Sequence, residues 1–147
     1  MMKRKTKFYF YSGFYILIIS SNLWLGSCAE NKISQCQKII LITQKIAEES
    51  SNNRQTKDIK KVLQVADSFE ETAQQMKQLK IEDEQLVEYQ MGFAEIYQGN
   101  ADTTRQFVSA LNNQDISTAR LMQQQVQQLG KKEQELSSQM NSYCQEN

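Results

Sequence analysis

The complete absence of proline is the feature that most limits what this 147-residue chain can fold into. Proline ends or kinks helices and glycine weakens them. Beyond residue 28 the chain holds only three glycines: Gly92, Gly99 and Gly130. Apolar residues recur in this region at alternating spacings of three and four, which is the pattern of amphipathic helices. The sequence therefore predicts an all-α fold built from long, uninterrupted helices.

Polar breaks divide residues 33–145 into four expected helices. The first ends at the run from Ser50 to Asn53, because these short polar side chains compete for backbone hydrogen bonds. The third is expected over 84–112, and the fourth follows a turn at 112–115. The expected N-caps, which are side chains that accept hydrogen bonds from the first helical amides, are Asp58 (with Thr56 as the alternative), Asp83 and Asp115.

Each expected helix carries one apolar stripe that should face a shared core. In chain order the stripes are Ile33, Cys36, Ile40, Thr43 and Ala47, widened by Ile39, Ile42 and Ile46; Ile59, Val62, Ala66, Phe69, Ala73 and Met76; Leu86, Gln90, Phe93, Tyr97, Thr104, Phe107 and Leu111, flanked by Tyr89, Ile96 and Val108; and Ala119, Met122, Val126, Leu129, Leu136, Met140 and Tyr143.

Two cysteines bracket the helical region, Cys36 near the start of the first helix and Cys144 near the end of the last. In an antiparallel up-and-down bundle, the two chain ends share one end of the bundle only if the number of helices is even. A Cys36–Cys144 disulfide is therefore natural for four helices and excluded for three. The alternative is a pair of half-buried thiols. The turn at 80–83 should lie at the same end as the cysteines, opposite the turns at 50–57 and 112–115.

The first 28 residues have the order of a bacterial secretory signal: four basic residues, an apolar run over 8–19, then mostly small residues. Leu25-Gly26-Ser27-Cys28 resembles a lipobox, which implies that residues 1–27 are cleaved as a signal peptide and that Cys28 is acylated, for example with palmitate. The expected domains are this signal, a lipid-anchored tether at 28–32 and a bundle at 33–145. The alternative is an uncleaved membrane anchor. Both alternatives place the body on the extracytoplasmic side, whether periplasmic, lumenal or at the cell surface.

Charge and composition exclude several classes of function. Removal of residues 1–27 takes away four basic residues and no acidic one. The remaining chain has 13 Lys and Arg and 17 Asp and Glu, which gives a net charge of −4. A mildly acidic body argues against nucleic acid as a partner. The chain has no histidine and no motif for a metal, a cofactor or a catalytic nucleophile. We therefore expect that the protein is not an enzyme and that it binds no cofactor or metal. The acidic group at 82–84 with Glu88 could hold a cation, but acids also favour helix N-termini for electrostatic reasons.

Three residues leave a question about the interior. Gly92 and Gly99 are seven residues apart and share a face, which fits either a close helix contact or bend, or two tolerated glycines on a weaker face; the second is the favoured interpretation. Glu133 is the one charged residue in a core position of the last helix. We expect its side chain to extend outward to solvent, the alternative being a buried ligand or acid.

Several short segments are shared with a known class of protein. They are the Gln35-Cys36-Gln37 context, a terminal Tyr143-Cys144, and a centre over 79–89 followed by Phe93. With the lipobox, this arrangement resembles small uncharacterised lipoproteins of the cyanobacterial type, over about residues 25–144. The resemblance supports the helical fold and implies no activity.

The sequence therefore predicts a membrane-anchored lipoprotein whose helical bundle serves as an interaction or accessory protein for an unidentified protein partner. The alternative is a carrier that binds a small molecule or a cation inside the bundle near Gly92, Gly99 and Glu133. A third hypothesis is an inhibitor of an envelope enzyme. A large internal cavity lined by Tyr97 or Glu133 would favour the carrier, and a filled core would disfavour it.

Overall fold

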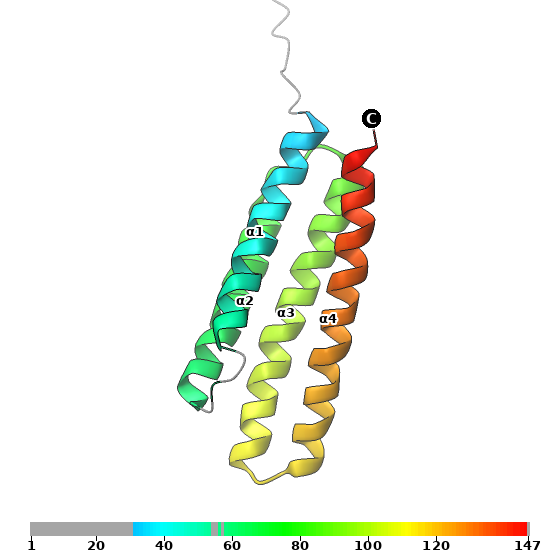
Figure 1. Cartoon of the computed structure of the whole chain (residues 1–147). Coiled ribbons are helices and arrows are strands. Elements are labelled where there is room, and N and C mark those ends of the chain that lie inside the picture. The colour runs from blue at the N-terminus through cyan, green and yellow to red at the C-terminus, as the bar shows by residue number, and fades with distance from the viewer. Residues whose placement is uncertain (1–30, 54–55, 57, 147) are drawn as a thin grey trace, which may run out of the picture.

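The computed structural model describes residues 31–53, 56 and 58–146, and these form four α-helices that run alternately up and down (Figure 1). The described residues include no β-strand. The prediction of an all-α antiparallel four-helix bundle is confirmed. The signal, Cys28 and most of the tether fall outside the described residues. The helices are α1 (Lys32–Asn53), α2 (Ile59–Gln78), α3 (Glu84–Asn112) and α4 (Ile116–Gln145).

The three predicted caps start the helices as expected. Asp58 accepts a hydrogen bond from the amide of Lys60 at 2.9 Å. Asp83 and Asp115 accept from the amides three residues further on, at 3.0 and 2.9 Å. Such a cap satisfies a backbone amide that has no partner within the helix, which fixes where the helix begins. The bounds of α3 agree with the predicted range of 84–112.

The ends of α1 differ slightly from expectation. The helix begins at Lys32, within the predicted tether, and continues through the polar run to Asn53. The hydroxyls of Ser50 and Ser51 donate hydrogen bonds to the carbonyls of Ala47 and Glu48. These bonds are made within the helix, so the serines are accommodated in the last turns instead of ending the helix.

The core is centred on α3. Phe93 and Tyr97 are fully buried one turn apart, with ring centroids 6.1 Å apart, and Phe69 of α2 lies at the same distance from Tyr97. All four helices contribute to the buried cluster, so no helix is peripheral to the core. Its fully or almost fully buried members are Cys36, Ile39, Ile46, Ala73, Met76, Leu86, Phe93, Ala94, Ile96, Tyr97 and Met140.

Some predicted core positions are wrong. In α1, Ile33 is 57% exposed and Ala47 is also exposed, whereas Gln35 is buried beside Cys36. The buried face of α1 is therefore rotated from the predicted stripe toward Gln35, Ile39 and Ile46. Ile59 and Leu111, at helix ends, are exposed as well. Burial at these ends is lost because fewer neighbouring helices cover them.

The glycines of α3 mark a close contact with α4. A Cβ atom added to Gly92 would lie 2.8 Å from Cδ2 of Leu136, and one added to Gly99 would lie 3.2 Å from Cδ2 of Leu129. Both distances are shorter than an ordinary van der Waals contact. The structure thus supports the close helix contact, and the favoured interpretation of a weaker face is wrong.

Replacing Gly130 by Ala should stabilise the protein by about 0.5–1 kcal/mol, because glycine weakens a helix interior by that amount relative to alanine. A Cβ atom at Gly130 would meet no heavy atom within 4 Å. Gly92→Ala is the matched control, since its gain in helix propensity is opposed by the contact with Leu136. Urea unfolding curves of the two variants check this. An equal gain from both would contradict the close contact.

The helices are unequal in length, so one end of the bundle is thinner than the other. At 1.5 Å per residue, α4 is about 45 Å long with its 30 residues and α1 about 33 Å with its 22. Figure 1 shows the α3–α4 pair extending past the ends of α1 and α2, on the side away from the C-terminus. We call residues 106–130, which include this end and its turn, the distal arm.

Candidate functional site

At the disulfide end of the bundle, one covalent bond and several hydrogen bonds join α1, α4 and the α2–α3 turn. Cys36 and Cys144 are joined by a disulfide, with an S–S distance of 2.02 Å and a Cα–Cα distance of 6.2 Å. This confirms the predicted pairing and the even-number argument behind it. The bond ties the first turns of α1 to the last turn of α4, and it closes a sequence separation of 108 residues.

Buried and half-buried polar side chains hold the α2–α3 turn at the same end. Gln35 Oε1 accepts hydrogen bonds from the amides of Glu82 and Asp83, at 2.7 and 3.1 Å. Tyr143 Oη donates to the carboxylate of Asp83, with its two oxygens at 3.0 and 2.9 Å. This hydrogen bond raises the pKa of Tyr143. As predicted, the turn lies beside Cys36 and Cys144, and the contacts connect it to both α1 and α4.

Lys32 completes the disulfide end. Its Nζ donates hydrogen bonds to the carbonyls of Tyr143 and Glu146, and it also lies 4.7 Å from the centroid of the Tyr143 ring. A cation at the C-terminus of a helix interacts favourably with the helix dipole. The sequence pattern did not reveal this role, nor that of Gln35 toward the α2–α3 turn, because each depends on contacts between residues distant in the chain.

A second polar contact lies inside the bundle. Tyr97 Oη donates a hydrogen bond to Glu133 Oε1 at 3.0 Å, between α3 and α4. Tyr97 is fully buried and Glu133 is half-buried. Glu133 therefore turns toward the core, and the expectation that it extends outward to solvent is wrong. Burial, followed by the nearby charge of Glu133 and this hydrogen bond, raises the pKa of Tyr97 far above its ordinary value.

Tyr97→Phe should lower the free energy of unfolding by about 1.5–3 kcal/mol at pH 8, because a hydrogen bond to a carboxylate is lost. Because the pKa of Tyr97 is raised in the folded protein, the folded state keeps this proton when the unfolded chain releases it, above about pH 10. The contribution of Tyr97 to the free energy of unfolding should therefore be fully present below pH 10 and decrease above it. The free energy of unfolding should fall less steeply with pH in the variant, which lacks this hydroxyl. Urea midpoints measured from pH 8 to 11 check this. Parallel declines in the two proteins would contradict it.

The acidic group at the start of α3 has local structural roles. Asp83 caps the helix and accepts from Tyr143, while Glu88 accepts a hydrogen bond from Gln85 at 2.9 Å. Within the described part of the chain, no group of three or more acidic, cysteine or histidine side chains has a geometry that could hold a metal ion. The position of the acids is accounted for by the helix N-terminus, where they are favoured electrostatically.

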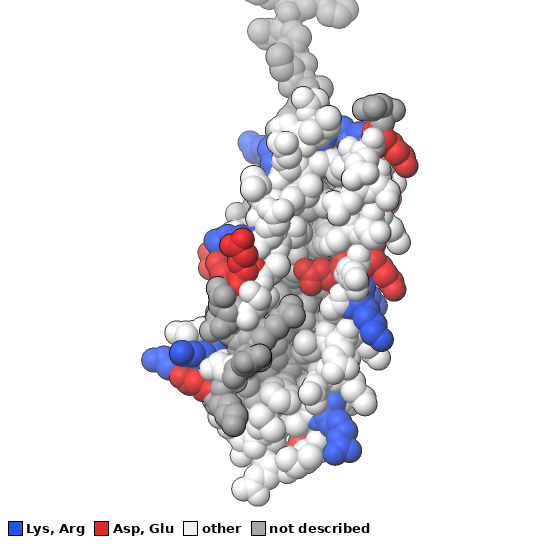
Figure 2. All heavy atoms as spheres, viewed as in Figure 1, with Lys and Arg blue, Asp and Glu red and all other residues white. Residues whose placement is uncertain are grey.

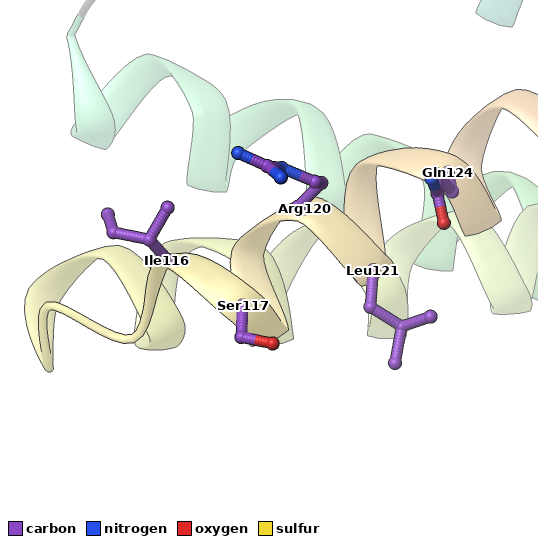
Figure 3. Close-up of a pocket in the computed structure, with 5 residues that line it drawn as sticks. All are labelled: Ile116, Ser117, Arg120, Leu121 and Gln124. Atoms are coloured by element: carbon purple, nitrogen blue, oxygen red, sulfur yellow. The ribbon is translucent and has the colours of Figure 1, made fainter.

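The outer surface of the described residues includes two hollows of similar size. The first, of about 360 Å³, lies on α4 in the distal arm (Figure 3), and it is lined by Ile116, Ser117, Arg120, Leu121 and Gln124.

The second hollow, of about 400 Å³, lies between α3 and α4 beside Gly92, and charged residues such as Glu95 and Lys132 line it. Neither hollow is lined by Tyr97 or Glu133. The second hollow borders Gly92, one of the three residues near which a carrier was expected to bind, but it lies on the outer surface and not inside the bundle.

Comparisons of this chain with protein-family models, with curated proteins and with solved structures gave no match. Among the residues that the structure describes, no helix is long and apolar enough to cross a bilayer.

Proposed function

We propose that this protein is a lipoprotein anchored through Cys28 to the extracytoplasmic face of a membrane, where its helical bundle acts as a non-catalytic interaction or accessory protein. The leader and the Leu25-Gly26-Ser27-Cys28 sequence carry the anchoring part of the proposal. The remainder rests on the geometry of the bundle and on its interior, where Phe93 and Tyr97 are fully buried.

The disulfide end is the part of the fold that best suits attachment to a surface. Only three residues separate Cys28 from Lys32, the first residue of α1. Four residue steps span at most about 14 Å, so an acylated Cys28 keeps this end close to the lipid. The disulfide and the hydrogen bonds around it hold α1, α4 and the α2–α3 turn together at the attached end. The tip of the distal arm would then lie about 45 Å, one length of α4, from the attached end, where it can meet other proteins.

The interior supports an interaction protein more than a carrier. Phe93 and Tyr97 occupy the centre of the bundle and are fully buried, and the Tyr97 hydroxyl is satisfied by Glu133. A ligand pocket is normally a cleft or cavity with polar groups available to the ligand. The hollow beside Gly92 lies on the outer surface and is not lined by Tyr97 or Glu133, so it does not provide the internal pocket that a carrier needs. We therefore assign function to the outer surface of the helices.

The test is a capture experiment on the full chain, expressed with its own leader and a C-terminal tag in native membranes. After chemical crosslinking, the protein is extracted in mild detergent and the crosslinked species are identified by mass. The proposal predicts a defined, stoichiometric crosslinked species that is lost in Cys28→Ala. Ser27→Ala is the matched control, because it keeps a small residue before the cysteine and should retain the species. Recovery of the protein alone in every case would contradict an interaction role.

A further inference from the structure

The distal arm differs in charge from the rest of the bundle. Within its 25 residues only Asp115 and Arg120 are charged. Asp115 is engaged as the cap of α4, accepting hydrogen bonds from the amide and hydroxyl of Thr118. Arg105, the residue just before the arm, still forms ion pairs with acidic side chains of α2. On the face shown in Figure 2, the end of the α3–α4 pair is accordingly mostly uncharged, whereas charges gather over the α1–α2 side and over the middle of α4.

The arm also exposes aliphatic side chains. Of the eight exposed large apolar residues in the described part of the chain, three lie in the arm: Leu111, Ile116 and Leu121. Ile116 and Leu121 are about 60% exposed. The cores of protein interfaces are depleted of charged residues and enriched in apolar surface. The arm thus combines few charged residues with exposed aliphatic side chains, and we take it as the candidate interaction surface.

We propose that this surface binds the same surface of a second copy of the chain, so that two anchored copies associate side by side through their distal arms. The inference rests on the proposed lipid anchor. Two copies attached to one membrane by equally short tethers share the same up-and-down orientation, and their arms lie at the same height. The two-fold axis that relates them then runs along the membrane normal, and the contact is isologous: the same patch on both copies.

An isologous contact requires a surface that is complementary to itself. A charged face would place like charges opposite one another, and the body beyond residue 28 has a net charge of −4. The arm avoids this repulsion. Its outer surface is rich in amides, and an amide both donates and accepts hydrogen bonds, so that the same side chain on two copies can pair reciprocally. The glutamines of the arm on α4 are Gln123, Gln124, Gln125, Gln127 and Gln128.

The directions of the α4 side chains suggest which residue to place at the two-fold axis between the copies. In the view of Figure 3, Arg120 extends from one side of α4, together with Ile116, and Leu121 extends from the other. A contact centred on Leu121 pairs an aliphatic side chain with its own copy and keeps the two Arg120 guanidiniums away from the axis. This arrangement buries apolar surface without opposing two cations.

The test uses the full chain in its native membrane, with a photo-crosslinking phenylalanine analogue in place of Leu121. The matched control carries the analogue in place of Leu41 of α1, which is also an exposed leucine, at 66% against 58% for Leu121. We expect a crosslinked species with twice the mass of the chain from position 121 and not from position 41. A second pair of variants carries the analogue at Gln124 with either Leu121→Glu or Leu41→Glu. Leu121→Glu should reduce the crosslinked dimer at least about tenfold, because like charges then meet at the axis, and Leu41→Glu should leave it unchanged.

Crosslinking of position 121 to a different protein, or to none, would overturn the proposal. So would equal dimer yields from positions 121 and 41, which would indicate mere crowding in the membrane. The mass of the uncrosslinked chain is read in the same sample. A chain that crosslinks to itself but keeps Met1 and an unmodified Cys28 would refute the lipid anchor, whereas an acylated chain that does not crosslink to itself would refute only the contact between copies.

Discussion

Cleavage of the Cys36–Cys144 disulfide is expected to lower the free energy of unfolding by about 4 kcal/mol. The bond closes a separation of 108 residues, and restricting so long a loop removes much of the conformational entropy of the unfolded chain. Most domains of this size are stable by only 5–15 kcal/mol, so the loss is a large fraction of the total. The measurement is urea unfolding with and without reductant, in mature chains that carry Cys28→Ala so that no acyl group interferes.

A double variant, Cys36→Ala with Cys144→Ala, is the control for this prediction. It should resemble the reduced protein and show no further loss when reductant is added. We expect the variant to keep its helices at low denaturant, since the core around Phe93 and Tyr97 does not depend on the disulfide. A reduced protein within about 1 kcal/mol of the oxidised one would mean that the cross-link contributes little to the stability of the bundle.

Phe93→Ala should be comparably destabilising, by about 3–5 kcal/mol. The ring is fully buried at the centre of the bundle and lies 6.1 Å from that of Tyr97, so its removal leaves a cavity that the rigid helices cannot close. Met91, two residues earlier on α3, is 41% exposed and provides the control. Met91→Ala should cost less than about 1 kcal/mol. Chemical unfolding of both variants checks the prediction, and similar losses from the two would place the centre of the core elsewhere.

The sequence was sufficient to predict the helices themselves. Asp58, Asp83 and Asp115 have short acceptor side chains at the starts of apolar patterns, and each caps the helix that follows it. The disulfide could also be predicted. Its two cysteines lie near the start of the first helix and the end of the last, and an even number of antiparallel helices brings these two positions to the same end of the bundle. These features depend on local chemistry or on chain topology, both of which can be derived from a single sequence.

The rotation of α1 about its own axis, which decides which side chains are buried, could not be predicted in the same way. Isoleucines occupy so many of its positions that several rotations of the helix bury a similar apolar area. The rotation observed is the one that buries Gln35 where it can accept from two amides of the α2–α3 turn. That choice depends on a segment almost 50 residues away, which the periodicity of α1 does not contain.

The interior contacts of α3 and α4 were missed for the same physical reason. Glu133 breaks the apolar pattern of its own helix, and it turns inward to accept a hydrogen bond from Tyr97 on the neighbouring helix. The spacing of Gly92 and Gly99 showed that they share a face. It did not show that Leu136 and Leu129 lie against that face.

We propose that the bundle is attached to a membrane through Cys28, with its disulfide end nearest the lipid. The intact mass of the protein, extracted from its native membrane, tests this attachment directly. We predict a chain that begins at Cys28, carries the added mass of acyl groups on that residue, and has no alkylatable thiol before reduction because Cys36 and Cys144 are joined. A mass that still includes Met1, with Cys28 unmodified, would contradict it.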